Sequence, residues 1–256
     1  MLPGWGIGNA GGATAGDADT RDLDTFVVPL ATQSNMDGSA VAASPEAWPD
    51  RAFMWSENGT LEPAQSPFEY GGDADANWTI AKGFAIEYLA ANPAHKIVFV
   101  PAAVGGTSFF NDRWNPGDDL YVDMVALTNA ATAATRANRV LAVLVQGFER
   151  DAIGGAVAAT FEAQLDAFIS ALRTDIDRAA GVPVILGELA DDVVGADAGR
   201  QAIRDVVLDT PNRVAGVAVA SSRTPSVVPT DDGVHFTTAG LMEMGRRHYN
   251  AFVGVS

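Results

Sequence analysis

Residues 25–38 read TFVVPLATQSNMDG and indicate the fold of the whole chain. The first half is a run of apolar and β-branched residues, too short for a typical helix and without helical periodicity, which is typical of a strand buried on both faces. The run breaks into polar residues at Gln33, Ser34 and Asn35. Open α/β sheets bind ligands at the carboxyl ends of their strands, so Ser34 is the first candidate nucleophile. Equally, these residues could merely cap a following helix.

Length and composition limit the classes of function. With 256 residues and a hydrophobic fraction of 48%, the chain can bury one large core. The 16 basic and 32 acidic residues give a net charge of −16, which repels nucleic acid and anionic membranes. We therefore expect neither as a partner. The chain has no cysteine, which excludes disulfides and thiolate nucleophiles, and no apolar run reaches the roughly 20 residues that span a bilayer.

The first 24 residues differ in composition from the rest. They are rich in glycine and aspartate, follow no periodic pattern and lack the charged start and apolar core of a signal peptide. We expect residues 1–24 to form a flexible arm and residues 25–256 a single domain. Neither a signal peptide nor a membrane span is visible, so the sequence is compatible with a cytoplasmic, a phage-associated or a trimmed secreted protein.

From residue 77 onward, strand-like and helix-like segments alternate. Strands are expected at residues 96–103, 139–146, 182–189 and 214–220, and helices at about 77–92, 118–136, 156–178, 197–208 and 237–252. This alternation predicts an α/β fold, a three-layer α/β/α sandwich around a parallel sheet of about five strands. Residues 39–76 are instead expected to be a long irregular loop, whose aromatic side chains could line a substrate cleft or anchor the loop to the core.

The chain has only three histidines, and the predicted sheet separates them. His95 precedes its strand and so lies at the edge opposite Ser34, whereas His248 falls late in the last helix, where a surface or packing role is expected. His235 follows the last strand and lies on the Ser34 edge. Asp232, three residues earlier, can orient the imidazole and stabilise the imidazolium that forms when it takes the serine proton. Asp231 is the neighbouring alternative, with a less suitable spacing.

Several short blocks, in order, carry a family resemblance. The chain resembles the SGNH hydrolases, and within them the carbohydrate esterases that include sialate O-acetylesterase-like and acetylxylan-esterase-like proteins. The family's blocks are GQSNM, a GGT turn followed by tryptophan, an LY pair, WxQGExD and DxxHF. They are matched here by Gln33 to Met36, Gly105 to Thr107, Trp114, Leu120-Tyr121, Val145 to Gly147 and Asp232 to Phe236.

This resemblance implies a role for each matched position. Ser34 would be the nucleophile, His235 the base and then the acid, and Asp232 the orienting carboxylate. The oxyanion would be held by the backbone N–H of Ser34, an N–H of the Gly105-Gly106 turn and the side-chain amide of Gln146. Such donors are needed because charge develops on the carbonyl oxygen in the transition state. The remaining candidates for contacting substrate or supporting the site are Gln33, Asn35, Thr107, Trp114 and Glu149.

Three positions depart from the family pattern. Thr32 replaces a glycine before Gln33, and Leu144 replaces a tryptophan. After Gln146 the sequence reads GFERDA where the family has GESDA, as though Phe148 had been inserted, so Glu149 either replaces the family glutamate from a shifted position or has no comparable role.

The sequence therefore predicts a serine esterase that removes small acyl groups, most simply acetyl, from a carbohydrate through an acyl-enzyme, without metal or cofactor. One alternative is an SGNH esterase or lipase-like enzyme acting on other short-chain esters. Another is a non-catalytic carbohydrate-binding or structural protein, such as a phage tail component. An acetylated carbohydrate or other small ester is thus the expected partner, and the sequence does not indicate an oligomeric state.

Overall fold

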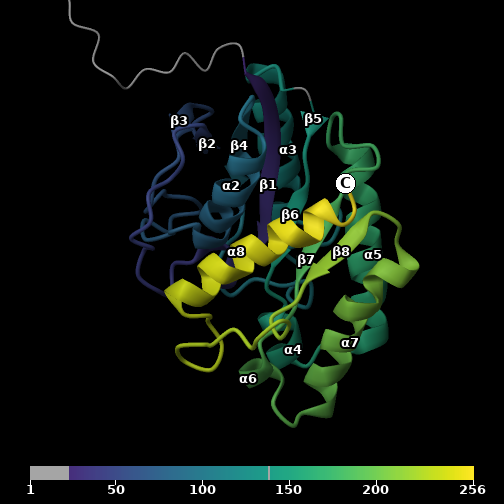
Figure 1. Ribbon diagram of the computed structural model, residues 1–256. Helices are drawn as coiled ribbons and strands as arrows, with labels where there is room; N and C mark the ends of the chain where they lie inside the picture. The colour runs from purple at the N-terminus through teal and green to yellow at the C-terminus, as the bar shows by residue number, and fades with distance from the viewer. Residues whose placement is uncertain (1–22, 138) are drawn as a thin grey trace, which may run out of the picture.

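The strands of the protein form one sheet, which the computed structural model shows for residues 23–137 and 139–256 (Figure 1). The sheet has the order β3-β2-β4-β1-β6-β7-β8, and β5 pairs with β1. The strands are β1 (Asp24–Thr32), β2 (Ala52–Trp55), β3 (Leu61–Pro63), β4 (His95–Pro101), β5 (Arg139–Val140), β6 (Val143–Gln146), β7 (Val184–Gly187) and β8 (Val217–Ala220). Residues 1–22 of the predicted arm (1–24) lie outside the described residues. The last residue of the predicted arm, Asp24, is instead the first residue of β1.

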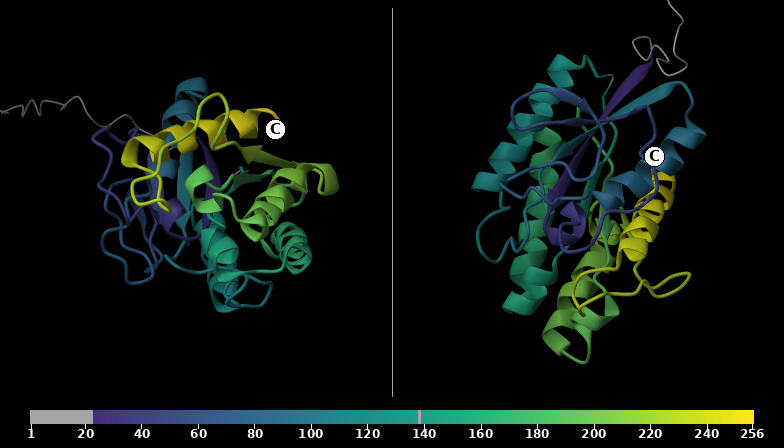
Figure 2. Two further views of the ribbon diagram at one scale, coloured as in Figure 1. Left: turned by 90° about the horizontal axis from the view of Figure 1, so that it is seen from below. Right: turned by 90° about the vertical axis from the view of Figure 1, so that its left-hand side faces the viewer.

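Helices cover both faces of this sheet, as Figure 2 shows: α2 and α8 lie on one side, and α3, α5 and α7 on the other. The chain therefore has the predicted three-layer α/β/α fold. The helices are α1 (Ser34–Asp37), α2 (Thr79–Ala91), α3 (Asp119–Ala134), α4 (Glu149–Gly154), α5 (Ala158–Asp175), α6 (Asp191–Val194), α7 (Ala198–Arg213) and α8 (Thr238–Val253).

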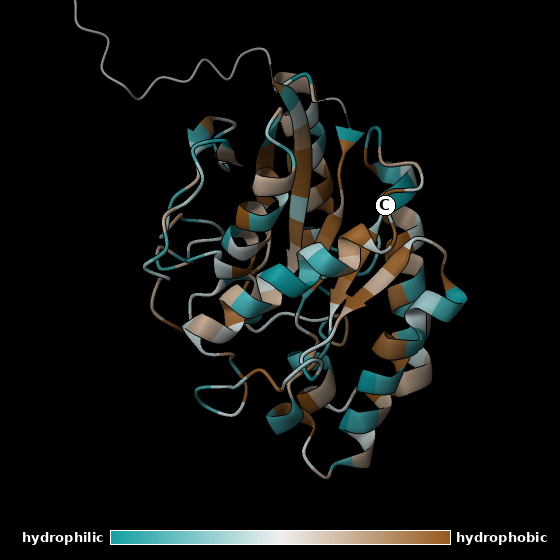
Figure 3. Ribbon diagram, in the orientation of Figure 1, coloured by the Kyte–Doolittle hydropathy of each residue, from teal (hydrophilic) through white to brown (hydrophobic). Residues whose placement is uncertain are grey.

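The central strand is β1, which runs parallel to β4 on one side and to β5 and β6 on the other. Every residue of β1 after Asp24 is buried, as its apolar sequence predicts. Colouring by hydropathy shows the same apolar character in β6, β7 and β8 (Figure 3). Because these neighbours are parallel, their carboxyl ends, and the loops that follow them, meet at one edge of the sheet. Ser34 follows β1 at that edge.

The sheet has eight strands, including the antiparallel β3, where about five parallel strands were expected. Residues 39–76 are not irregular throughout, because they contain β2, parallel to β4, and β3, antiparallel to β2. The strand predicted at 139–146 is divided into β5 and β6. The short helix α4 was not predicted, and it precedes a helix that begins only at Ala158.

Helices α2 and α8 cross at two glycines. A Cβ on Gly83 would lie 2.5 Å from the carbonyl oxygen of Met242, and a Cβ on Gly245 would lie 2.8 Å from the Cα of Gly83. No side chain fits between the two backbones there. This close crossing matters for the site, because α2 follows the loop bonded to α1, and α8 begins three residues after His235.

Candidate active site

Ser34 is the first residue of the four-residue helix α1, directly beyond the carboxyl end of β1. Its Oγ lies 2.9 Å from Nε2 of His235, 201 residues later in the sequence. Gln33 occupies the N-cap position, and its side chain makes no capping hydrogen bond. The alternative that residues 33–35 serve only as a helix cap therefore does not describe the geometry of Ser34.

The loop after β8 brings Asp232 to the other side of the imidazole. Asp232 Oδ2 lies 2.7 Å from Nδ1 of His235, and Oδ1 accepts the backbone N–H groups of His235 at 2.7 Å and Val234 at 2.9 Å. These hydrogen bonds hold the pKa of Asp232 far below its usual value. The largest contribution comes from the backbone N–H of His235 and the next from its side chain. Asp232 is thus ionised. Asp231 instead donates its backbone N–H to the carbonyl of His235.

The other two histidines lie where the sequence analysis placed them. His95 begins β4 at the opposite edge of the sheet, where its Nδ1 lies 2.8 Å from the hydroxyl of Tyr88. His248 is fully buried in α8, with Nδ1 2.8 Å from the carbonyl oxygen of Met244. Burial lowers the pKa of His248 to about 4, so this side chain is neutral and serves packing.

Glu149 is the centre of a buried network behind Ser34. One carboxylate oxygen accepts a hydrogen bond from the Gln33 amide, and the other accepts one from Asn35 Nδ2 at 2.8 Å. Asn35 also donates to the carbonyl of Val234 at 3.1 Å and accepts the N–H of Phe236 at 3.0 Å. The Asn35 side chain therefore connects the serine helix to the histidine loop.

The extra residue Phe148 does not prevent Glu149 from reaching this position. The Phe148 ring is fully buried against Phe109 and Phe161, with ring centroids 6.4 and 5.4 Å away. Before it, Gly147 has φ +114°, and a Cβ there would lie only 2.5 Å from Gln33 Cγ. A glycine is required at this approach, because it tolerates positive φ and leaves room for the Gln33 side chain.

The turn predicted to hold the oxyanion lies beside Ser34. A Cβ built on Gly105 would be 3.7 Å from Ser34 Cβ, so the two backbones face each other closely. Gly106 has φ +73°, which favours glycine. Among the described residues, nothing accepts a hydrogen bond from the N–H of Gly105 or Gly106. Both groups are thus available to a ligand.

Gln146 is placed differently from this turn. Its side chain is fully buried against Gly187, and neither amide atom has a hydrogen-bond partner among the described residues. Its backbone carbonyl accepts the hydroxyl of Thr32 at 2.7 Å. The role of the Gln146 amide in an oxyanion hole therefore remains a prediction.

Thr107 and Trp114 hold the glycine turn in place from behind. The Thr107 hydroxyl lies 2.7 Å from the carbonyl oxygen of Val104 and accepts the indole N–H of Trp114 at 2.8 Å. Both side chains are buried, Trp114 completely. Of the two roles considered for this pair, the geometry fits support of the site, because a fully buried indole cannot contact substrate.

Two buried carboxyl groups near the site were missed by the sequence analysis. Asp37, one helical turn after Ser34, has one oxygen bonded to the N–H of Ser39 and one without a partner, and burial raises its pKa to about 6. Asp151 in α4 accepts the N–H of Phe110 at 2.9 Å, and burial raises its pKa to about 7. Nothing local marks either residue, since both lie in ordinary polar stretches.

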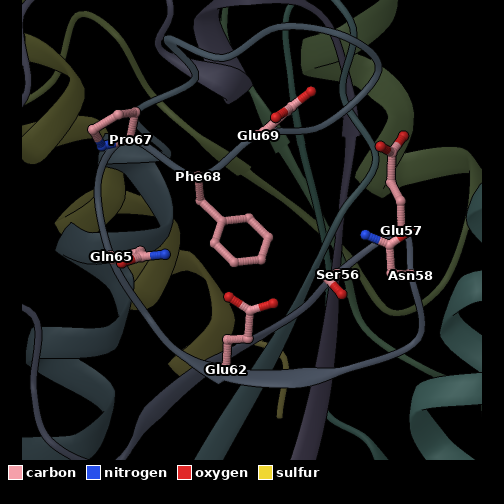
Figure 4. Close-up of a pocket in the computed structure, with 8 residues that line it drawn as sticks. All are labelled: Ser56, Glu57, Asn58, Glu62, Gln65, Pro67, Phe68 and Glu69. Carbon is pink, nitrogen blue, oxygen red and sulfur yellow. The ribbon is translucent and has the colours of Figure 1, made fainter.

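Most aromatic side chains of residues 39–76 serve packing. Trp55, Phe68 and Tyr70 are buried. Phe68 also reaches a cavity of about 440 Å³ beyond the carboxyl end of β2, where Figure 4 shows its ring facing Glu62. The cavity is lined by Ser56, Glu57, Asn58, Glu62, Gln65, Pro67, Phe68 and Glu69.

Residues 23–137 and 139–256 contain neither a cluster of metal ligands nor a helix that could span a membrane. No group of three or more histidine, aspartate or glutamate side chains is arranged to hold a metal ion. Within the same ranges, no helix is both long enough and apolar enough to cross a membrane.

Comparison with known families identifies the chain. The family model described as "Carbohydrate esterase, sialic acid-specific acetylesterase" matches residues 24–254. The chain belongs to this family. Membership in this carbohydrate esterase family makes it an ester hydrolase by descent and confirms the resemblance seen in the short sequence blocks. No curated protein sequence matches the esterase with significance.

Solved structures share the fold of the esterase. A protein from Arabidopsis thaliana has a TM-score of 0.70 at 19% identity, over 91% of this chain and 98% of that one. NanS has a TM-score of 0.63 at 16% identity, over 91% and 98%. A carbohydrate acetylesterase from Xanthomonas citri has a TM-score of 0.59 at 18% identity, over 91% of this chain and 56% of that one. A protein from Agrobacterium tumefaciens that is described as an arylesterase has a TM-score of 0.52 at 12% identity and shares the same fold.

Proposed function

We propose that this protein is a serine esterase that removes small acyl groups, most simply O-acetyl, from a carbohydrate through an acyl-enzyme on Ser34. The observation that carries the proposal is the continuous contact from Ser34 Oγ through His235 to Asp232, at 2.9 and 2.7 Å. Membership in a carbohydrate esterase family supports the class of substrate.

From these hydrogen bonds we assign each group a step in the proposed reaction. The ionised Asp232 accepts Nδ1–H of His235, so Nε2 carries the lone pair and can take the proton of Ser34 as Oγ attacks the ester carbonyl. The imidazolium then gives this proton to the departing sugar oxygen as its bond to the acyl carbon breaks, which releases the sugar as a free hydroxyl. A water molecule, deprotonated by the same Nε2, attacks the acyl-enzyme and releases the acid and free Ser34.

The carbonyl oxygen becomes negatively charged in both steps. We assign its stabilisation to backbone N–H groups of Ser34, Gly105 and Gly106. The first N–H of a helix has no partner within the helix, and the two glycine N–H groups are unused among the described residues. Removing one such donor typically lowers kcat by about 10²–10³.

The test is hydrolysis of p-nitrophenyl acetate by Ser34→Ala, with Ser170→Ala as a matched control on the exposed face of α5. We expect the first variant to lose at least about 10³-fold in kcat, since the nucleophile is gone, and the second to match wild type. Hydrolysis by Ser34→Ala at the wild-type rate would show that the site is assigned to the wrong residue.

A further inference from the structure

Three exposed apolar side chains lie on the loop after the glycine turn, in α4 and directly before α5. Phe110 is 50% exposed, Ile153 41% and Val157 67%. The Phe110 ring lies over Gly154, the residue after Ile153, because a Cβ on that glycine would be 3.0 Å from Phe110 Cδ1. Phe110 is the only aromatic residue among the large exposed apolar side chains of the described residues.

Two chains of contacts link Phe110 to the surroundings of Ser34. Its loop begins at Gly105, which faces Ser34, and closes through a hydrogen bond of 3.5 Å from Asn111 Nδ2 to the carbonyl of Gly106. From the other side, α4 begins with Glu149, which is bonded to the residues flanking Ser34. The ring therefore belongs to the rim of the active site.

The Phe110 side chain is also held in a fixed position. Asp151 accepts its backbone N–H at 2.9 Å, and Gly154 provides a flat backbone surface against which the ring lies. A Cβ at position 154 would be 3.0 and 3.3 Å from two ring carbons, so a larger residue there would displace the ring. A rigid aromatic surface costs little conformational entropy when a ligand binds.

We propose that Phe110 is the sugar-stacking platform of the substrate site and that it binds the C–H face of an uncharged pyranose ring next to the acetylated position. This inference rests on the proposed function and adds its substrate class. A pyranose has an apolar face of C–H groups that matches the negative face of an aromatic ring, while its rim of hydroxyls needs polar partners. The exposed Asp112, two residues after Phe110, can supply one.

The size of the patch argues against a protein partner. Stable protein interfaces bury about 800 Å² on each side, from roughly 20–30 residues. A single exposed aromatic ring packed against one glycine offers a much smaller surface. The position at the rim of the serine site also makes the patch continuous with the place where the ester must lie.

The test compares Phe110→Ala and Phe110→Trp with wild type on two kinds of ester. One is the best cleaved member of a panel of acetylated xylo-oligosaccharides and uncharged O-acetylated O-antigens. The other is methyl acetate, which is too small to reach the platform. We expect Phe110→Ala to lower kcat/KM for the glycan at least about tenfold, mainly through KM, and to change methyl acetate hydrolysis less than twofold. Phe110→Trp should retain glycan hydrolysis.

Two controls separate this proposal from others. Val253→Ala removes another exposed apolar side chain, at the end of α8, and should change neither reaction. Binding of the same glycan to Ser34→Ala, measured by calorimetry with and without Phe110→Ala, tests the platform without catalysis and should show the same loss of affinity.

Several results would overturn the proposal. Equal losses on both esters would show that Phe110 only supports the glycine turn. Unchanged glycan hydrolysis by Phe110→Ala, or a loss confined to long-chain aliphatic esters, would exclude a sugar as occupant. If wild type cleaves methyl acetate but no glycan, the platform is wrong while the serine site stands. If wild type cleaves neither methyl acetate nor any glycan of the panel, the proposed function itself is wrong.

Discussion

Single residues near Ser34 carry strain and charge that the fold has to compensate. Thr32 has φ +93°, in a region that β-branched residues rarely adopt. Its hydroxyl lies 2.7 Å from the carbonyl oxygen of Gln146, across the join between β1 and β6. This bond offsets part of the strain and explains how threonine is accepted at a position where the sequence resemblance implies glycine.

At position 32 we expect a glycine variant to be more stable than an alanine variant, the reverse of the usual order of stability. Thr32→Ala loses the hydroxyl and keeps the strained backbone, whereas Thr32→Gly loses the hydroxyl and relieves the strain. We expect Thr32→Gly to be the more stable variant by about 1 kcal/mol, within the 1–3 kcal/mol typical of such strain. Urea denaturation of both measures the difference, and an alanine variant that is equally or more stable would refute this explanation.

Asp37 gives the stability a dependence on pH. Its pKa rises from 3.8 in the unfolded chain to about 6 in the fold, chiefly because the carboxyl is buried; nearby Asp73 adds to the rise, and Ser39 and His235 oppose it. Between these values the folded protein binds more protons than the unfolded chain. The Asp37 contribution to stability is therefore lost progressively as pH rises from about 4 to about 6.

Asp37→Asn removes this titration while keeping an acceptor for Ser39. The stability of Asp37→Asn relative to wild type should increase by about 2 kcal/mol between pH 4 and pH 7, given about 1.4 kcal/mol for each pKa unit. Urea denaturation at several pH values measures it, with the exposed Asp177→Asn as control. A constant difference across this range would mean that Asp37 does not titrate as described.

At the scale of elements, α4 joins the parts of the site. Glu149 in its first turn holds Gln33 and Asn35, and Asp151 in the same turn holds the loop that follows the glycine turn. One short helix thus connects the residues on either side of Ser34 with the loop that follows the glycine turn. This function depends on the two carboxylates accepting hydrogen bonds, so it is sensitive to their replacement by amides.

Glu149→Gln should lower kcat about 10- to 100-fold with little change in KM, since small displacements of catalytic groups have effects of this size. The glutamine places an NH2 group against the side-chain NH2 group of Gln33 or Asn35, and two donors cannot form a hydrogen bond with each other. Kinetics with methyl acetate test this, and the control is Glu162→Gln in α5, where the Glu162 side chain is 44% exposed and lies 3.6 Å from Arg213. A variant with unchanged kcat would show that the network does not position the serine.

Elements also show what the sequence can predict. The long alternating segments were predicted correctly, because burial on both faces gives central strands such as β1 and β4 an unmistakable apolar run. The pair β2 and β3 and the helix α4 were missed, since they are short and their pattern is set by neighbours. Ser34, Asp232 and His235 could be proposed from topology and the scarcity of histidine. The burial of Asp37 and Asp151 follows only from tertiary packing.

At the scale of the molecule, the site depends on two halves of the chain meeting. Ser34 begins α1, directly after the first strand, and His235 lies in a loop 201 residues later. Asn35 bonds directly to that loop. The glycine crossing of α2 and α8 holds these halves together further from the site. We therefore expect the geometry of the catalytic groups to depend on this distant contact.

Gly245→Ala should destabilise the whole protein by at least about 2–3 kcal/mol, because the methyl group would overlap the backbone of α2, where neither helix can yield easily. Thermal unfolding measures the loss. Gly254→Ala, beyond the end of α8, places its Cβ at an ordinary 3.4 Å from a carbonyl oxygen and should be nearly neutral. Equal stability of the two variants would contradict the importance of the crossing.

The most direct test of the central claim is acetate release from O-acetylated polysaccharides, measured for wild type and Ser34→Ala side by side. Suitable substrates are acetylxylan, O-acetyl sialosides and bacterial O-antigen. If Ser34, His235 and Asp232 form a carbohydrate esterase, wild type releases acetate from at least one of them and Ser34→Ala from none. Release by Ser34→Ala at the wild-type rate, or no release from any glycan by either protein, would contradict the account.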